Sequence, residues 1–375
     1  MKITGVKSIM FTAGKQNIDM HWHEGTWNAE NAHYTNNDTF NLVGKPVTLN
    51  VNGKQTKEEI KYVFVSNLDC MTFDENNHLI KNEIDGNMEM LNECKIHPQK
   101  KPYAVCQAGY GSAENIEKLI RENPNKFVGL KFHPMVFQQD ANSAVYEPYM
   151  KIAEKYNLPC LFHSDKTGSY ACPKKIYELA QKFPKVPVIL AHLGAGTDHQ
   201  DAINVLLDSI ETGKANLYGD TSWVDCKNEE MPTLKNLIAR LQQTKKGDQT
   251  KRLLYGSDAP LGEFGAPGKK VDGFYADNLS TLKTMISKNF HTNAEKLSDN
   301  ICFFNSKELF LDKNWAKNLD RTKFLTARSA GIILTAAALA GGLYGAIHFT
   351  LKNPNQNSET ANIYTATKPQ INLLV

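Results

Sequence analysis

Four short apolar segments of the sequence end in residues that can bind a metal ion. His21 and His23 end the first segment, NIDMHWH, while His163, His192 and Asp258 end three later ones. Side chains alternate across a strand, so two histidines separated by one residue point to the same side and can bind one ion. Imidazole nitrogens and a carboxylate oxygen suit Zn²⁺, with water completing its coordination. These residue types therefore favour a divalent-metal site, with Zn²⁺ as the first candidate.

Each of these residues is a weak signal by itself. A single histidine at a strand end is more often structural, and an HxH pair also occurs in polar surface loops. The pattern gains weight because it recurs, since His133 ends a further apolar segment, KFVGLKFHP. Histidine or aspartate at equivalent ends of five different segments argues against coincidence, provided that those ends meet at one face of the fold.

The elements that must bring these residues together follow from the apolar pattern. Eight apolar runs of strand length lack alternation, which is typical of strands buried on both faces of a parallel sheet. Amphipathic segments lie between the runs, so strand and helix units alternate and predict a (β/α)₈ barrel. An open doubly wound sheet is the alternative, but no glycine-rich dinucleotide motif follows the first run. The runs are NIDMHWH (17–23), YVFVSNLD (62–69), PYAVCQAG (102–109), KFVGLKFHP (126–134), LPCLFHSD (158–165), VPVILAHLG (186–194), ANLYGDTSW (215–223) and KRLLYGSDAP (251–260).

One connection departs from this compact repeat. The first run is followed by a long segment, residues 24–55, which contains the stretch VTLNVNGK. Asn52 and Gly53 in this stretch predict a tight turn. We expect an enlarged loop between the first strand and its helix, which could act as a lid over the site.

The ordered set IDMHWH, GLKFHP, CLFHSD, ILAHLG and LLYGSDAP resembles the amidohydrolase superfamily, in its amidohydrolase-related branch. The resemblance runs from Asn17 to about Phe310 and includes NICFFNSKELF, which is similar to the closing segment of that family. The branch contains metal-dependent hydrolases and nonoxidative decarboxylases. The resemblance therefore implies a TIM barrel with a metal site at the carboxyl ends of its strands.

The resemblance also implies a role for each strand-end residue. His21, His23, His163 and Asp258 correspond to the metal ligands. His192 corresponds to a catalytic histidine that polarises the substrate or the attacking water. Asp258 would be catalytic as well, because a carboxylate beside a metal-bound water can accept its proton.

Four further polar residues near strand ends are predicted to contact the substrate, namely Lys131, His133, Glu24 and Trp223. Each could equally support a ligand or have a structural role. Lys131 is ambiguous, because a carboxylated lysine on the fourth strand bridges two metal ions in binuclear relatives. The arrangement GLKFHP also resembles the mononuclear branch. We therefore expect one divalent ion, with a second only if Lys131 is carboxylated.

The resulting hypothesis is a metal-dependent hydrolase that activates water to cleave a C–N or C–O bond of a small molecule. The same site could instead perform nonoxidative decarboxylation, or the barrel could bind a ligand without catalysis. Arg252, the one arginine near this part of the pattern, lies at the opposite end of its strand, so no arginine is placed to bind a substrate carboxylate. The formal net charge of +3 gives no reason to expect nucleic acid.

The carboxyl-terminal region differs in composition from the barrel. Residues 329–351 contain no Asp, Glu, Lys or Arg and are long enough to cross a ~30 Å hydrocarbon layer as a helix. Basic residues precede them, so the positive-inside rule places the large domain in the cytoplasm of a single-pass membrane protein. The expected parts are an N-terminal segment (1–16), the barrel (17–315), a basic linker (316–328), the transmembrane helix (329–351) and a flexible polar tail (352–375).

Two smaller features bear on assembly and compartment. Gly341 and Gly345 form a GxxxG spacing, which could let two membrane helices pair in a homodimer. The seven cysteines include no CxxC pair and favour free thiols in a reducing compartment.

Overall fold

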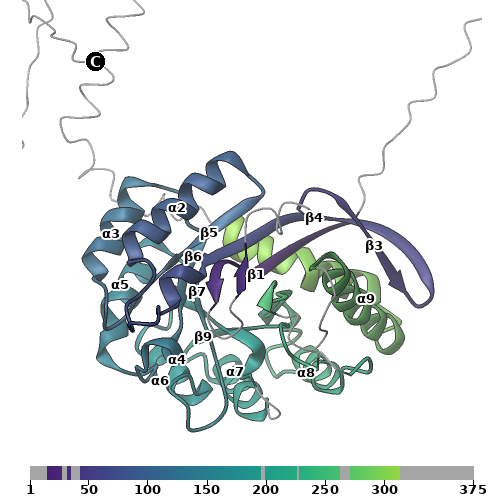
Figure 1. Ribbon diagram of the computed structural model, residues 1–375. Coiled ribbons are helices and arrows are strands. Elements are labelled where there is room, and N and C mark those ends of the chain that lie inside the picture. Colours follow the sequence, from purple (N-terminus) through teal and green to yellow (C-terminus); the bar gives the residue numbers. More distant parts are fainter. Residues whose placement is uncertain are drawn as a thin grey trace, which may run out of the picture. The chain divides into compact units, whose positions relative to one another are not determined.

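Eight parallel strands form the centre of the protein in the computed structural model, which describes residues 15–27, 32–34, 43–195, 199–225, 228–261 and 271–312 (Figure 1). Neighbouring strands pair in the order β10-β9-β8-β7-β6-β5-β4-β1. Their bounds are β1 (Gln16–Trp27), β4 (Lys54–Asn67), β5 (Lys100–Val105), β6 (Gly129–Phe132), β7 (Cys160–Phe162), β8 (Pro187–Leu190), β9 (Asn216–Asp220) and β10 (Leu253–Leu254). Each lies within or overlaps one of the eight predicted apolar runs.

The two ends of this strand order meet and close the barrel. Main-chain hydrogen bonds run from Met20 N to Tyr255 O at 3.1 Å and from His23 N to Ala259 O at 2.8 Å. A third runs from Asp258 N to His21 O at 2.9 Å. The closing seam therefore lies between β1 and the residues that follow β10, and it places the HxH pair beside Asp258.

Amphipathic helices surround the strands (Figure 1). Proline begins α6 and α8, where its missing N–H costs no helical hydrogen bond. The longer helices are α2 (Glu83–Ile96), α3 (Ala113–Glu122), α5 (Glu147–Tyr156), α6 (Pro173–Lys182), α7 (Gln200–Thr212), α8 (Pro232–Gln242) and α9 (Val271–Asn289). The shorter helical pieces are η2 (Leu68–Met71), α4 (Pro134–Phe137), η3 (Ala144–Tyr146), η4 (Ala191–Leu193), η5 (Thr250–Arg252), α10 (Ala294–Asp299), η7 (Asn300–Phe304) and η8 (Lys307–Leu311).

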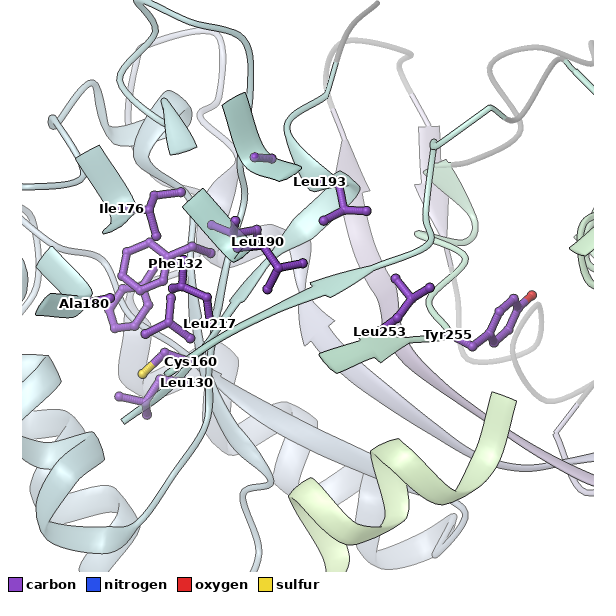
Figure 2. Packing of buried hydrophobic residues seen from close by; sticks show 14 of the residues in the cluster. Leu130, Phe132, Cys160, Ile176, Ala180, Leu190, Leu193, Leu217, Leu253 and Tyr255 are labelled. Atoms are coloured by element: carbon purple, nitrogen blue, oxygen red, sulfur yellow. The ribbon is translucent and has the colours of Figure 1, made fainter. Parts of the chain in front are cut away.

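The core has two layers because strand side chains alternate between the two faces of the barrel wall. Phe132 and Leu190 point outward and pack with the helix residues Ile176 and Ala180 (Figure 2). The inner layer fills the barrel and includes Ile18, Met20, Phe64, Tyr103, Leu161, Ile189, Leu254 and Phe310. Burying each such side chain stabilises the fold by roughly 1.5–3 kcal/mol. The predicted TIM barrel is confirmed, with a packed interior beneath the carboxyl ends of the strands.

The long connection after β1 differs from the expected lid. It contains β2 (Ala32–Tyr34) and β3 (Pro46–Val51), and β3 pairs antiparallel with the first half of β4 through the predicted turn at Asn52 and Gly53. The main-chain N–H groups of Asn50 and Asn52 donate to side-chain hydroxyls of α9.

This hairpin ends at the wrong place for a lid. Strand β3 pairs with residues 54–59, which form the amino end of β4. The candidate site lies at the opposite, carboxyl ends of the strands. The alternating apolar pattern and the Asn-Gly turn favour a hairpin over an open loop, so the lid interpretation is wrong for residues 46–55. Residues 28–31 and 35–42 lie outside the described residues.

The predicted membrane segment also lies outside the described residues, together with the linker 316–328 and the tail 352–375. The chain divides into two units, Met1–Leu319 and Asp320–Val375. Within the described parts of the first unit, no helix is long and apolar enough to span a bilayer.

Candidate active site at the closing seam of the barrel

Three side chains from β1 and the segment after β10 converge on one point. His23 Nε2 lies 3.2 Å from His21 Nε2, and Asp258 Oδ1 lies 2.9 Å from His23 Nε2 and 3.1 Å from His21 Nε2. All three residues are buried. Alternation along β1 directs both imidazoles to the same side, as the HxH spacing predicted. The structure thus brings together three of the four predicted metal ligands.

Hydrogen bonds orient each of these three side chains. Asp220 Oδ2 lies 2.8 Å from His21 Nδ1, and Ser66 Oγ lies 2.8 Å from His23 Nδ1. Both rings therefore present Nε2 to the common point. Trp223 Nε1 donates to Asp258 Oδ2 at 2.6 Å, which leaves Oδ1 facing the two histidines. Such outer contacts fix ring orientation in metal sites.

Burial and mutual charge set the protonation states of this group. Burial lowers the pKa of His21 well below its usual range, and the Lys131 ammonium lowers that pKa further. Burial also lowers the pKa of His23. Burial alone would raise the pKa of Asp258, but the neighbouring imidazoles outweigh it and hold this pKa well below the usual range. Two neutral imidazoles and one carboxylate are the forms that bind a divalent metal.

His192 lies beside this group at the end of β8. His21, His192 and Asp258 each offer a ligand atom, and these atoms lie within 4.8 Å of one another. Burial lowers the pKa of His192 to about 4, so its ring is neutral at neutral pH. Its backbone adopts a left-handed conformation with φ of 61°, which is uncommon for a non-glycine residue and turns the chain sharply after β8.

Lys131 reaches the same point from β6. Its Nζ lies 2.8 Å from His21 Nε2, and the side chain is buried. Burial lowers the pKa of Lys131 to about 8, although the Asp258 and Asp220 carboxylates raise it. The ammonium form therefore donates to the lone pair that a metal ion would use, and a fraction of the amine is neutral near physiological pH.

The other predicted residues lie near the group without joining it. His163, at the end of β7, stacks on His133 with ring centroids 4.0 Å apart, and its centroid lies 5.1 Å from that of His192. Among the described residues, His163 does not join the group of His21, His23 and Asp258 or the group of His21, His192 and Asp258. Its role as a metal ligand therefore stays a prediction. Glu24 forms a buried ion pair of 2.7 Å with Lys100. Contacts of Glu24 and His133 with a substrate likewise stay predictions.

His21, His23 and Asp258, called the close ligand set below, have a geometry that fits a small divalent ion. A tetrahedral ion with bonds of about 2.0–2.2 Å needs ligand atoms roughly 3.3–3.6 Å apart. The separations between His21, His23 and Asp258 are 2.9–3.2 Å, a few tenths of an ångström shorter. The donor set of two nitrogens and one carboxylate oxygen also suits Zn²⁺, with His192 near enough to act on a group bound there.

Several residues of the site were missed by the sequence reasoning. Asp19 Oδ1 accepts from the main-chain N–H groups of His21 at 3.0 Å and Ser257 at 3.1 Å, and Asp19 Oδ2 accepts from Ser257 Oγ. This carboxylate therefore ties β1 to the segment that carries Asp258. Burial raises the pKa of Asp19 to about 7, although those hydrogen bonds oppose the shift. The alternation D-x-H-x-H could have identified Asp19, whereas nothing in the sequence pointed to Ser66.

A glycine at the seam leads to a first prediction. An added Cβ at Gly256 would lie 2.8 Å from His21 Cβ, closer than real contacts of this kind. We expect Gly256→Ala to lower the free energy of unfolding by about 1–3 kcal/mol and to weaken metal binding, because His21 must shift. Urea unfolding and Zn²⁺ titration would measure the two effects. Gly213→Ala, whose Cβ would meet no atom within 4 Å, is the control for the Zn²⁺ titration alone, because the φ of 69° at Gly213 strains alanine and lowers stability by itself. Unchanged stability and affinity in Gly256→Ala would contradict the packing described here.

Comparison with known proteins adds a family to this geometry. A family profile described as Amidohydrolase matches residues 71–297. His21 and His23 precede these residues, so their place in the site rests on the geometry. No curated protein matches the chain in sequence.

Two solved structures share the fold. A proposed 2-pyrone-4,6-dicarboxylic acid hydrolase from Pseudomonas putida is 13% identical, with a TM-score of 0.51, and the match covers 79% of this chain and 97% of that chain. A proposed amidohydrolase from Staphylococcus aureus is also 13% identical, with a TM-score of 0.51 and coverage of 79% and 99%. At such low identity both similarities concern the barrel alone.

Proposed function

Because the chain belongs to the amidohydrolase family, we propose that it is a metal-dependent hydrolase that cleaves a C–N or C–O bond of a small molecule. The observation that carries the proposal is the convergence of His21, His23 and Asp258 within 3.2 Å of one another, with His192 beside them. Packing alone gives little reason to bury these four side chains together. As a group they suit one metal ion and one reacting water molecule.

The residues divide the work according to their protonation states. His21, His23 and Asp258 Oδ1 would hold the metal ion, most simply Zn²⁺. When bound, such an ion lowers the pKa of a water molecule and polarises a carbonyl oxygen. Asp258 is ionised, and its Oδ2, which Trp223 orients and the metal would leave free, can accept the proton of the attacking water. Neutral His192, whose Nδ1 contacts Ser222 Oγ, can orient the attacking water by accepting a hydrogen bond at its other ring nitrogen.

One metal ion is the simpler assignment. The Lys131 amine lies against His21 Nε2 and is partly neutral near pH 8, so carboxylation by carbon dioxide is chemically accessible. A carboxylated Lys131 would add an anionic bridge and permit a second ion. Metal analysis with and without bicarbonate distinguishes one ion per chain, which we expect, from two.

The experiment that tests the function uses the full-length protein in mild detergent. The protein is stripped with a chelator, reloaded with Zn²⁺ or Mn²⁺, and incubated with libraries of amides, lactones, esters and unsaturated carboxylic acids. Metal-dependent formation of a hydrolytic product supports the proposal. Release of carbon dioxide without a hydrolytic product would establish the decarboxylase alternative. Ligand binding that survives metal removal, without turnover, would instead favour a non-catalytic barrel.

We also propose that residues 329–351 anchor the protein in a membrane with the barrel in the cytoplasm. The absence of formal charge across this segment supports the proposal. We expect the full-length chain to stay with membranes after alkaline extraction, and a chain truncated after Arg328 to be released. A full-length protein that alkaline extraction releases completely would refute integral insertion. Cross-linking through the GxxxG segment, compared with Gly341→Ile, would test the homodimer.

A further inference from the structure

One buried carboxylate contacts residues at the carboxyl ends of three strands, β1, β8 and β9. Asp220, the last residue of β9, accepts at Oδ1 from the main-chain N–H of His192 at 2.9 Å and from the main-chain N–H of Ser222 at 3.0 Å. The hydroxyl of Ser222 lies 2.5 Å from the same oxygen. The other oxygen, Oδ2, faces His21 Nδ1 at 2.8 Å. Asp220 and Ser222 are both fully buried.

We propose that Asp220 and Ser222 are positioning residues that fix the tautomers of two imidazoles at once, those of His21 and His192. In both rings the proton lies on Nδ1, and Nε2 is left as an unprotonated acceptor. One carboxylate thereby prepares a metal ligand on β1 and the catalytic histidine after β8 for the same point in the site.

The tautomer of His21 follows from its two shortest ring contacts, with Asp220 and Lys131. Asp258 Oδ1 lies farther away, 3.1 Å from His21 Nε2, and is nearer to His23 Nε2 at 2.9 Å. Burial raises the pKa of Asp220, although the hydrogen bonds from Ser222 and His192 oppose this shift. All three donors lie at Oδ1, so Oδ2 is placed to accept from His21 Nδ1, which then carries the proton. On the other side of the ring, the Lys131 ammonium can only donate, and it lies 2.8 Å from His21 Nε2. Both of these shortest contacts favour the same tautomer, with the proton on Nδ1.

The tautomer of His192 follows through the hydroxyl of Ser222. This hydroxyl has one proton, and the carboxylate oxygen 2.5 Å away takes it. Ser222 Oγ is then an acceptor for the ring nitrogen of His192, which lies 2.8 Å away. His192 Nδ1 must therefore donate, and Nε2 keeps its lone pair. The chain of bonds runs from His192 through Ser222 to the charge on Asp220, which strengthens each bond in it.

The backbone around His192 depends on the same segment of β9. His192 has φ of 61° and Leu193 has φ of 47°, and each such conformation costs about 1–3 kcal/mol unless the surroundings hold it. The Asp220 carboxylate binds the main-chain N–H of His192. An added Cβ at Gly219 would lie 2.2 Å from Leu193 Cδ2, so only glycine lets Leu193 pack there. Gly219 thus leaves space for Leu193, and Asp220 binds the main chain of His192, so both residues stabilise the sharp turn after β8.

The first test measures the tautomers directly in the metal-free, full-length protein labelled with ¹⁵N-histidine. Long-range ¹H–¹⁵N correlation spectra distinguish Nδ1–H from Nε2–H rings, and the signals are assigned by their loss in His21→Gln and His192→Asn. We expect both rings as the Nδ1–H form. An Nε2–H form of either ring in the wild-type protein overturns the inference, whether or not any variant folds.

The second test reverses one of the bonds. In Asp220→Asn, the amide oxygen keeps the three donors of Oδ1, so the NH₂ group must face His21 Nδ1 and donate to it. His21 is then forced into the Nε2–H form, which blocks its lone pair. We expect the His21 signal to switch tautomer and the affinity for Zn²⁺, measured by chelator competition, to fall roughly 10- to 100-fold. Unchanged affinity and tautomer in folded Asp220→Asn would refute the assignment.

Asp225→Asn is the matched control, because Asp225 lies in the same connection after β9 and accepts from two main-chain N–H groups at the start of α8. An asparagine oxygen can accept those bonds equally well. We expect its Zn²⁺ affinity to equal that of the wild-type protein. A loss as large as that of Asp220→Asn would show a general disturbance of this connection and would count against the inference.

The third test separates the two imidazoles. Ser222→Ala removes the acceptor of His192 but leaves Asp220 Oδ2 at 2.8 Å from His21 Nδ1, to which Ser222 Oγ makes only a long contact of 3.4 Å. We expect the His192 signal to change alone, with Zn²⁺ affinity within about threefold of the wild-type value. Ser209→Ala, which removes another buried hydroxyl from α7, should leave both rings unchanged. A change at His21 as large as that at His192 would contradict the separate routes.

Only the Zn²⁺ affinities in these tests rest on the proposed function, whereas the tautomers do not. If the wild-type protein binds no metal ion, the proposed function fails, while the tautomers remain measurable in the same sample. If metal binds and either ring carries its proton on Nε2, the proposed function stands and this inference fails.

Discussion

Replacing His21 by alanine is expected to abolish stoichiometric metal binding and to lower kcat/KM by more than about 100-fold. Even changes to groups that only orient a metal ligand cost roughly 10- to 100-fold in metal affinity or activity, and this change removes a proposed ligand itself. His21 is also the residue that touches most of the site, because its ring contacts Asp220, Lys131, His23 and Asp258. Metal content by mass spectrometry and the rate on a substrate found in the library screen would measure the two effects.

A loss of folding could imitate this result, because the change leaves Asp220 Oδ2 without its partner in a buried place. Circular dichroism and urea unfolding of His21→Ala therefore accompany the metal analysis. His21→Gln, which keeps a polar side chain of similar length, provides a second variant. His78→Ala is the surface control, since the His78 side chain is 79% exposed and far along the chain from the site. A folded His21 variant that retains one metal ion per chain would contradict the assigned ligand set.

Replacing His192 by asparagine is expected to lower kcat by about 10²- to 10⁴-fold while the metal ion stays bound. The reason is that we propose His21, His23 and Asp258 as the metal ligands and His192, which lies beside them, as the residue that acts on the reacting group. Asparagine suits this test because it tolerates the left-handed backbone that His192 adopts at φ of 61°. KM and kcat measured separately, together with metal content, would distinguish the two roles.

The control for this variant is His291→Asn, at an exposed position between α9 and α10. It should leave kcat and metal content unchanged. Loss of the metal ion from His192→Asn would make His192 a ligand and would reassign the chemistry to Asp258 alone. A kcat within threefold of the wild-type value would exclude His192 from catalysis.

The barrel could be predicted from the sequence because its signals are local. Each strand appears as a short apolar run, and each helix as apolar residues at three- and four-residue spacing, without reference to distant residues. The turn at Asn52 and Gly53 was predicted for the same reason. The error lay in what the turn joins, because the pairing of β3 with the amino end of β4 depends on residues beyond the turn itself.

The site was predicted in part. The spacing of His21 and His23 predicted two rings on one side of a strand, and the barrel topology predicted that Asp258 and His192 end near them. The placement of Glu24 against Lys100 was not predictable, because the two residues belong to different strands and meet only after the sheet forms. The stacking of His133 on His163 has the same origin.

The sequence by itself determined which residue types stand at the strand ends and on which side of each strand they lie, because strand periodicity follows from local backbone geometry. Only the tertiary structure decided which nitrogen of each histidine faces the site. That choice depends on hydrogen bonds between residues far apart in the chain, such as His21 with Asp220, 199 positions away, and His192 with Ser222, 30 positions away. A ring nitrogen takes its role from the partner of the other nitrogen, and those partners meet only when the barrel closes.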